Sequence, residues 1–292
     1  MRLMPNPPPE VTHDMTGDTR PRPLRVCGTA AAEGFPGIHC GCDTCAEAWL
    51  RGGKDLRSRA AYDLGDDVRI DFGPDSYLHA RAAGRGFSRL RHLLVTHSHE
   101  DHWYPLELAY RDPGFCIVPE GPPLVVYGNE RVVASARTIL GDGTKLNVEF
   151  RTIAPFETFT LGDDIRVTTL RASHAPDEDA LNLIIEERGR SVLIGHDTGW
   201  WDDETWDFIA GRHVHVALVD CTYGRYDTDR HHLGAPAVIR FVGRLQELGC
   251  LDPSSRPIAT HISHNGHALH SDLKALLGPH GIEVAWDGMV IE

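Results

Sequence analysis

One short stretch, Thr96 to His102, constrains the fold of this chain more than any other, and its sequence is THSHEDH. It follows the apolar run Leu93-Leu94-Val95, which is typical of a short buried strand. Three imidazoles and a carboxylate this close together cannot all enter an apolar core, because each buried polar group without a partner costs roughly 1–3 kcal/mol. A pair of metal ions would satisfy them. The stretch therefore predicts a metal-binding loop at a strand end, completed by ligands from elsewhere.

Four later strand ends also carry residues of the metal-ligating type. Apolar runs lead into His174, into His196-Asp197, into Asp220-Cys221 and into His261-Ile262-Ser263-His264. A single histidine at such a place is more often a hydrogen-bonded structural residue. Four apolar runs that each end in such a residue are hard to explain by the alternation of buried and exposed positions along a strand. We therefore expect several of these residues to join the loop at 97–102.

Strand-like segments dominate both halves of the chain, with helical segments between them. The strands expected from alternation or apolar content are 24–27, 68–73, 90–95, 122–128, 148–153, 157–161, 165–170, 181–186, 191–194, 214–219, 257–260 and 282–286. The expected helices are 46–57, 76–84, 105–110, 129–140, 235–248 and 271–277. This order favours an α+β fold of two sheets packed face to face with helices outside, because a doubly wound sheet alternates strand and helix more regularly.

The first 23 residues differ in composition from the rest. They are rich in proline and polar residues and have no apolar core of a secretory signal. We therefore expect a flexible leader over 1–23 and one domain over 24–292. No stretch approaches the ~18 consecutive apolar residues of a membrane span, so we expect no membrane partner.

The formal net charge is -13. Nucleic-acid binding depends on positive surface, so a nucleic-acid partner is disfavoured. A small anionic substrate stays compatible with this charge, because metal ions supply local positive charge. Seven cysteines without a signal sequence favour reduced thiols and the cytoplasm.

Three of the cysteines are crowded into a C-x-C-x2-C motif. Cys40, Cys42 and Cys45 are close enough in sequence for several thiolates to reach one ion, and the fourth ligand must be His39 or come from elsewhere. The preceding small-residue turn, 28–34, is either a simple tight turn, which we favour, or a phosphate-binding loop.

The motif H-x-H-x-D-H at 97–102, followed by His174, by Asp197 before Thr-Gly and by His261, resembles the metallo-β-lactamase superfamily of binuclear hydrolases over residues 68–261. The resemblance implies a four-layer αββα sandwich. It also implies three ligands for one metal ion, three for a second, and one carboxylate that bridges both. These are, in that order, His97, His99 and His174; Asp101, His102 and His261; and Asp197. Such ligands suit zinc, and also manganese or iron. A hydroxide between two such ions attacks at neutral pH, because metal binding lowers the pKa of water to roughly 7.

A closer resemblance lies at the two ends of the domain. The T-H-I-S-H sequence at 260–264, the tail at 283–289, the turn at 28–34 and the cysteine motif are similar to the PhnP family of cyclic phosphodiesterases. In that family the cysteines and the second histidine bind a structural zinc. Carried over, its ligands are Cys40, Cys42, Cys45 and His264. If 261–264 is extended, His261 and His264 point to opposite faces and serve different metals.

The same resemblance implies a catalytic histidine after Asp220-Cys221. The candidates are His231 and His232, and His232 fits better by its distance to His261 and its place before the next helix. Asp101 is expected to be catalytic as well as a ligand. Arg225 and Arg230 lie nearby in sequence and are candidates to hold a second phosphate.

Some residues have no role in the resemblance. We expect three tryptophans to be core residues, which is the default interpretation for this side chain. The alternative is that they line a pocket for a different substrate. They are Trp103, Trp200 and Trp201. Three further histidines are expected to be structural or exposed; they are His196, His267 and His270.

The resemblance implies hydrolysis of a small cyclic phosphate ester, such as 5-phosphoribosyl 1,2-cyclic phosphate, with a homodimer as the expected assembly. Two alternatives stay open. One is a lactone or thioester hydrolase that uses the same metals. The other is a non-catalytic metal-binding or carrier protein like PqqB, which shares the cysteine motif.

Overall fold

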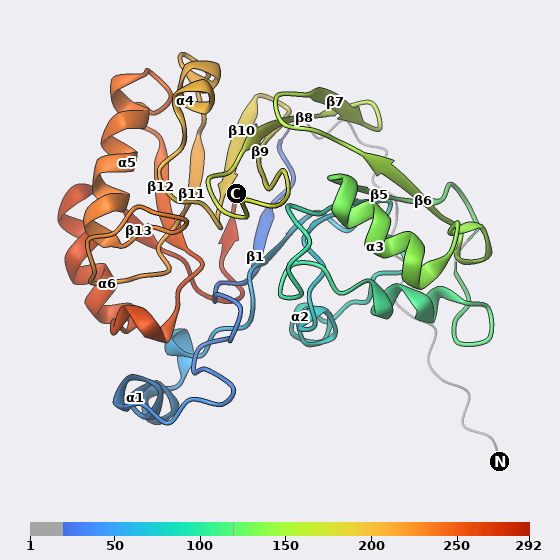
Figure 1. Cartoon of the computed structure of the whole chain (residues 1–292), viewed down its shortest axis with the longest axis horizontal. Coiled ribbons are helices and arrows are strands. Elements are labelled where there is room, and N and C mark those ends of the chain that lie inside the picture. Colours follow the sequence, from blue (N-terminus) through green and yellow to red (C-terminus); the bar gives the residue numbers. More distant parts are fainter. Residues whose placement is uncertain (1–19, 119) are drawn as a thin grey trace.

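Two seven-stranded sheets form the centre of the molecule, and helices cover the outer face of each (Figure 1). The structure is a computed structural model that describes residues 20–118 and 120–292. The αββα sandwich expected from the sequence is thus confirmed.

The first sheet holds mainly the N-terminal strands. They are β1 (Leu24–Gly28), β2 (Ala61–Leu64), β3 (Val68–Ile70), β4 (His92–Leu94), β5 (Leu124–Gly128), β6 (Val148–Thr152) and β14 (Val290–Ile291), in the spatial order β14-β1-β2-β3-β4-β5-β6. The second sheet holds β7 (Thr158–Leu161), β8 (Ile165–Arg171), β9 (Leu181–Glu187), β10 (Arg190–Gly195), β11 (Val216–Asp220), β12 (Arg256–Thr260) and β13 (Glu283–Val284), in the order β13-β12-β11-β10-β9-β8-β7. Strands β7 to β10 are antiparallel and β10 to β13 are parallel.

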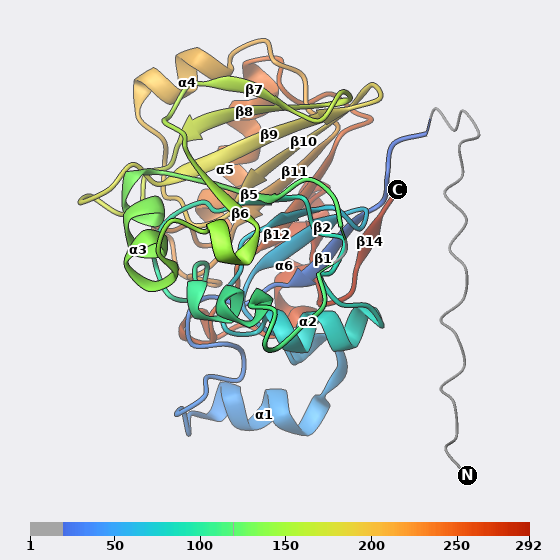
Figure 2. The same ribbon diagram turned by 90° about the vertical axis from the view of Figure 1, so that its right-hand side faces the viewer.

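Most of the helices lie on the two outer faces. The helices are α1 (Asp43–Arg51), α2 (Ser76–Ala83), α3 (Glu130–Leu140), α4 (Asp203–Ile209), α5 (Ala235–Glu247) and α6 (His270–Leu277), with short 3-10 helices η1 (Gly53–Asp55), η2 (Pro105–Arg111), η3 (Thr144–Leu146), η4 (His264–Gly266) and η5 (Gly278–His280). Helix α1 lies at one end of the molecule, away from the layers (Figure 1 and Figure 2).

Apolar side chains fill three layers between these elements. Ile70 and Leu94 of the first sheet meet Ile194 and Leu218 of the second in the central layer. One outer layer lies under α4, α5 and α6, and the other under η2 and α3. Strand β11 is therefore covered on both faces, which explains why it is apolar from Val216 to Val219 rather than alternating.

The sequence did not indicate β2, β14 or α4, and the helix expected at 105–110 is the 3-10 helix η2. The strand expected at 282–286 is only β13, after which the chain crosses to the first sheet as β14. Helix α4 begins where the Asp202 carboxylate accepts from the Thr205 N–H at 2.8 Å.

The expected leader lies mostly outside the described residues, which begin at 20. Arg22, at its end, donates hydrogen bonds to Asp67 after β2 and to Glu187 of β9. Within 20–118 and 120–292, no helix is long and apolar enough to cross a membrane.

Candidate metal centre

The loop after β4 is held in shape by its own backbone. The N–H groups of His102 and Trp103 both donate to the carbonyl oxygen of His99, at 3.0 and 2.8 Å. The Ser98 hydroxyl donates to Glu178 at 2.8 Å. These contacts orient the ligand-type side chains of the loop in one direction, toward the ends of β8, β10 and β12.

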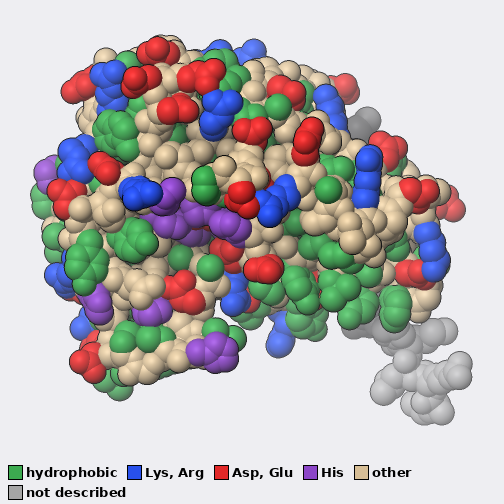
Figure 3. Space-filling view, viewed as in Figure 1, with side chains coloured by type: hydrophobic (Ala, Val, Ile, Leu, Met, Phe, Trp, Pro, Cys, Tyr) green, Lys and Arg blue, Asp and Glu red, His purple; other side chains and the backbone are tan. Residues whose placement is uncertain are grey.

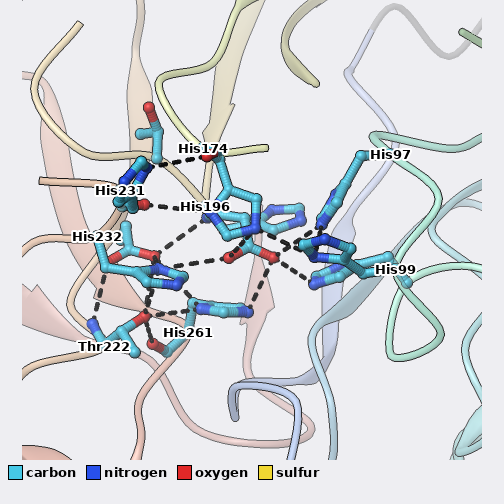
Figure 4. Close-up of polar contacts among 12 residues, drawn as sticks. His97, His99, His174, His196, Thr222, His231, His232 and His261 are labelled. Atoms are coloured by element: carbon cyan, nitrogen blue, oxygen red, sulfur yellow. Dashed lines mark hydrogen bonds and ion pairs between the residues drawn. The ribbon is translucent and has the colours of Figure 1, made fainter. Parts of the chain in front are cut away.

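A first group of three imidazoles meets at the outer side of this loop. His97 Nε2 lies 2.9 Å from His99 Nδ1, and His174 Nε2 lies 3.2 Å from the same atom (Figure 4). Ligands on a tetrahedral zinc ion at 2.0–2.1 Å are about 3.3 Å apart. The three nitrogens therefore have the spacing of ligands around one ion, as expected for His97, His99 and His174.

A second group lies deeper, and all its members are buried. It consists of Asp101, His102, Asp197 and His261. Asp197 lies between the two groups, because one carboxylate oxygen is 3.5 Å from His174 Nε2 and the other is 3.3 Å from His261 Nε2. This is the placement expected of a bridging ligand.

Two nitrogen atoms in the second group are buried without a hydrogen-bond partner: His102 Nε2 and His261 Nε2. His102 donates from its other nitrogen to Asp71, so its Nε2 lone pair is available. An unsatisfied buried polar atom costs roughly 1–3 kcal/mol, and a metal ion would remove that cost. The donor set thus fits a divalent ion.

Asp71 supports the site from below. At the end of β3, its carboxylate accepts from His102 Nδ1 at 2.7 Å, from His196 Nε2 at 2.8 Å and from the Thr96 N–H at 2.9 Å. Burial opposes ionisation of Asp71, but His102 and His196 outweigh it and hold the pKa of the carboxyl well below its usual range. The residue also has a positive φ of 62°. His196, expected to be structural, is a fully buried part of this network.

Asp220 plays the matching role at the end of β11. Its carboxylate accepts from the Asp197 N–H at 3.1 Å and from His232 Nδ1 at 3.1 Å, and lies 3.3 Å from His261 Nδ1. Burial opposes its ionisation, but His232 and His261 outweigh burial and keep the pKa of Asp220 below its usual range. Thr222 donates to the same carboxylate at 3.0 Å.

The cysteine motif forms a separate group near the N-terminus of α1. Its members are Cys40, Cys42, Cys45 and His264. His264 Nδ1 lies 3.6 Å from Cys40 Sγ and 3.7 Å from Cys42 Sγ. The structure therefore brings His264 to the thiols, whereas His39 is exposed and outside the group.

His261 and His264 serve different groups, as expected, but not through an extended backbone. His261 has a positive φ of 56°, and η4 begins at His264. Between them, Ile262 pairs with Ala30, so the segment lies against the N-terminal turn.

The comparison with known families agrees with this geometry. Residues 67–262 match the family described as Beta-lactamase superfamily domain. The chain belongs to the metallo-β-lactamase superfamily.

Relatives of this superfamily member include proteins called Coenzyme PQQ synthesis protein B. The one from Cupriavidus necator is 25% identical over 317 residues, covering 92% of this chain and 98% of the relative. The one from Cupriavidus taiwanensis is 35% identical over 138 residues, covering 40% of this chain and 42% of the relative.

Two solved structures are similar in fold. Zinc-bound PqqB from Methylobacterium extorquens has a TM-score of 0.71 at 20% identity, covering 92% of this chain and 99% of that one. A diphosphatase from the PhnP family has a TM-score of 0.71 at 21% identity, covering 92% and 97%. With the residue groups above, these findings support divalent-metal binding by this superfamily member.

Histidine side chains gather in one patch on the face shown in Figure 3, whereas His97, His102 and His261 of the site are buried. His99 is exposed, and His232 is partly buried beside His174, with the two rings 4.7 Å apart. Arg230 is exposed on the same loop as His232. Arg225 is engaged elsewhere, because it donates to the His267 carbonyl at 2.7 Å and pairs with Asp272 at 3.1 Å.

The tryptophans are packed rather than arranged around a pocket. Trp201 is buried and donates to Asn182 at 2.8 Å, and Trp103 is buried and donates to Ser135 at 2.9 Å. Trp200 is partly buried and packs against Trp206, with ring centroids 5.1 Å apart.

The remaining sequence features are also structural. His270 accepts from Arg57 at 3.1 Å, and His267 is exposed. The N–H groups in the turn at 28–34 are engaged by backbone carbonyls: those of Thr29 and Ala30 donate to Ser58, and that of Gly34 donates to Ala31 within the turn at 3.0 Å. It is therefore a tight turn, with no free donors at these positions for a phosphate.

Proposed function

We propose that this protein is a metal-dependent phosphodiesterase that opens a small cyclic phosphate ester. The observation that carries the proposal is the placement of His232 beside the metal-ligand groups. Its Nδ1 lies 3.1 Å from Asp220 and 3.4 Å from Asp197. A metal carrier needs the ligands but has no use for a further imidazole held by a buried carboxylate.

Seven residues would hold two divalent ions, zinc or manganese, which supply an activated water and neutralise charge on the phosphoryl oxygens. The ligands are His97, His99, His174, Asp101, His102, His261 and Asp197. Asp71 and Asp220 keep the ligand imidazoles oriented through their Nδ1 atoms. The four cysteine-group residues would hold a third, structural zinc.

His232 would act on the leaving group. Because its Nδ1 faces Asp220, its Nε2 is the atom left to donate a proton from the doubly protonated ring, a form that the Asp220 carboxylate favours. As the water oxygen bonds to phosphorus and the ring P–O bond breaks, the departing alkoxide takes that proton. Asp101, beside His102 at 2.9 Å, would orient the water as well as bind metal.

Arg230 would bind a second phosphate of the substrate. It is exposed on the loop that carries His232, whereas Arg225 must first leave Asp272. The net charge of -13 disfavours nucleic acid and stays compatible with a small anion. All seven cysteines lie in the described residues and none of them forms a disulfide, which supports a cytoplasmic protein. A homodimer is proposed on family resemblance.

A second candidate is a PqqB-like metal-binding or carrier protein. It is favoured by the near-complete coverage of relatives named for coenzyme PQQ synthesis. A lactone or thioester hydrolase would use the same ligands, and the PhnP-like cysteine group and tail weigh against it.

One experiment separates these functions. Metal content is measured first, and the protein is then assayed with bis(p-nitrophenyl) phosphate and a homoserine lactone, with Asp197→Ala as control. We expect phosphodiester turnover that Asp197→Ala abolishes and that His232→Ala lowers by about 10²- to 10⁴-fold. A fully metal-loaded protein without phosphodiester turnover contradicts the proposal, and binding of PQQ under those conditions favours the carrier.

A further inference from the structure

His231, at the rim of the site, is joined to the candidate ligand His174 by two hydrogen bonds in opposite directions (Figure 4). His174 Nδ1 donates to the carbonyl oxygen of His231 at 3.2 Å. His231 Nδ1 donates to the carbonyl oxygen of His174 at 3.0 Å. The ring of His231 is exposed and belongs to neither metal-ligand group.

The first of these bonds determines which nitrogen of His174 carries a proton. A neutral imidazole has one N–H and one lone pair. With the proton on Nδ1 and aimed at the His231 carbonyl, the lone pair lies on Nε2. That atom is 3.2 Å from His99 Nδ1, inside the first ligand group.

The direction of the His231 carbonyl depends on an unusual backbone conformation. His231 has a positive φ of 63°, which places it in the left-handed region. Residues other than glycine adopt this region rarely, and residues with β-branched side chains adopt it least. A neighbouring loop holds it there. A Cβ on Gly199 would lie 2.5 Å from His231 N and 2.4 Å from the Asp229 oxygen, so only glycine permits this approach. Gly199 N in turn donates to Ser173, next to His174.

We propose that His231 is a positioning residue whose left-handed backbone aims its carbonyl at His174 and so presents His174 Nε2 to the metal. The inference rests on the metal-binding part of the proposed function and needs no particular substrate. It also explains the placement of His232, since the same loop segment is joined to His174 and the two rings are 4.7 Å apart.

The test compares two substitutions that separate the backbone from the ring. His231→Gly keeps the left-handed conformation and removes the ring, whereas His231→Val disfavours that conformation. Metal-free full-length protein is titrated with Co²⁺ against a competing chelator. We expect His231→Val to weaken Co²⁺ binding at the histidine sites by about 10- to 100-fold, which is the usual effect of losing a residue that orients a metal ligand. We expect His231→Gly to change this affinity by less than about threefold.

Two controls keep the test interpretable. The thiolate-to-cobalt charge-transfer band reports the separate cysteine group and should be unchanged in a folded variant. Asn147→Val places valine at another left-handed position, with φ 51°, far from the site, and should cost stability without weakening Co²⁺ binding. Unchanged affinity in His231→Val, or equal losses in His231→Val and His231→Gly, would overturn the proposal. Neither readout depends on phosphodiester turnover. A wrong assignment of the substrate can therefore be distinguished from a wrong inference about His231.

Discussion

His102 donates its Nδ1 proton to Asp71 at 2.7 Å, and both side chains are inaccessible to solvent. Asp71 belongs to neither of the two groups expected to bind the metal pair, yet it fixes the tautomer of one candidate ligand and also holds His196. The candidate metal centre therefore depends on a strand end that precedes the histidine motif in the chain.

Replacing this carboxylate should weaken metal binding. In Asp71→Asn an amide faces three donors and cannot accept from all of them. We expect about 10- to 100-fold lower affinity for Zn²⁺, measured by chelator competition. The matched control is Asp66→Asn, a half-exposed aspartate, which should bind Zn²⁺ as the parent does. Equal affinity in both variants would rule out the supporting role of Asp71.

Cys42→Ser should lose one equivalent of zinc and lower stability, because a structural ion contributes folding free energy directly. Metal content is determined by elemental analysis, and the melting temperature by calorimetry. Cys116→Ser changes a partly buried cysteine outside the group and should alter neither quantity. Full zinc content in Cys42→Ser would contradict the assignment of this group.

Trp201→Ala should cost about 3–5 kcal/mol of unfolding free energy, since a large buried ring and its bond to Asn182 are both lost. Trp49→Ala is the control, because that ring is 66% exposed and should change the free energy by less than about 0.5 kcal/mol. Urea unfolding measures both. A small loss for Trp201 would favour the alternative in which the ring lines a pocket.

His270 makes stability dependent on pH. Burial and the neighbouring Arg57 lower its pKa from 6.5 to about 4 in the folded protein. The neutral ring is therefore favoured by folding, and this contribution is complete above pH 6.5 and is lost as pH falls toward 4. Discounting for the half-exposed ring, the parent should lose about 1 kcal/mol more than His270→Gln between pH 7 and 5. Parallel losses in urea unfolding would exclude this contribution.

Much of the metal centre was predictable because its signals are local. The motif at 97–102 places four candidate ligands in one loop, and His174, Asp197 and His261 each follow an apolar run. The two sheets followed from the density of strands. Asp71 could not be singled out, because the strand expected at 68–73 includes it, whereas the observed β3 ends at Ile70.

Other features could not be predicted because they depend on distant contacts. Strand β14 has only two residues, too few for any periodicity, and forms only against β1. The role inferred for His231 depends on a backbone angle and on a glycine in another loop, neither of which its own sequence neighbours specify.

The pairing of β14 with β1 has a consequence for how the chain acquires its shape. Leu24 pairs with Ile291, so β1 cannot complete its pairing until residues more than two hundred positions later have been synthesised. The cysteine group is likewise incomplete until His264 has been synthesised. Closure of long loops slows folding. The N-terminal half is therefore synthesised before β1 has its β14 partner and before the three thiols have His264.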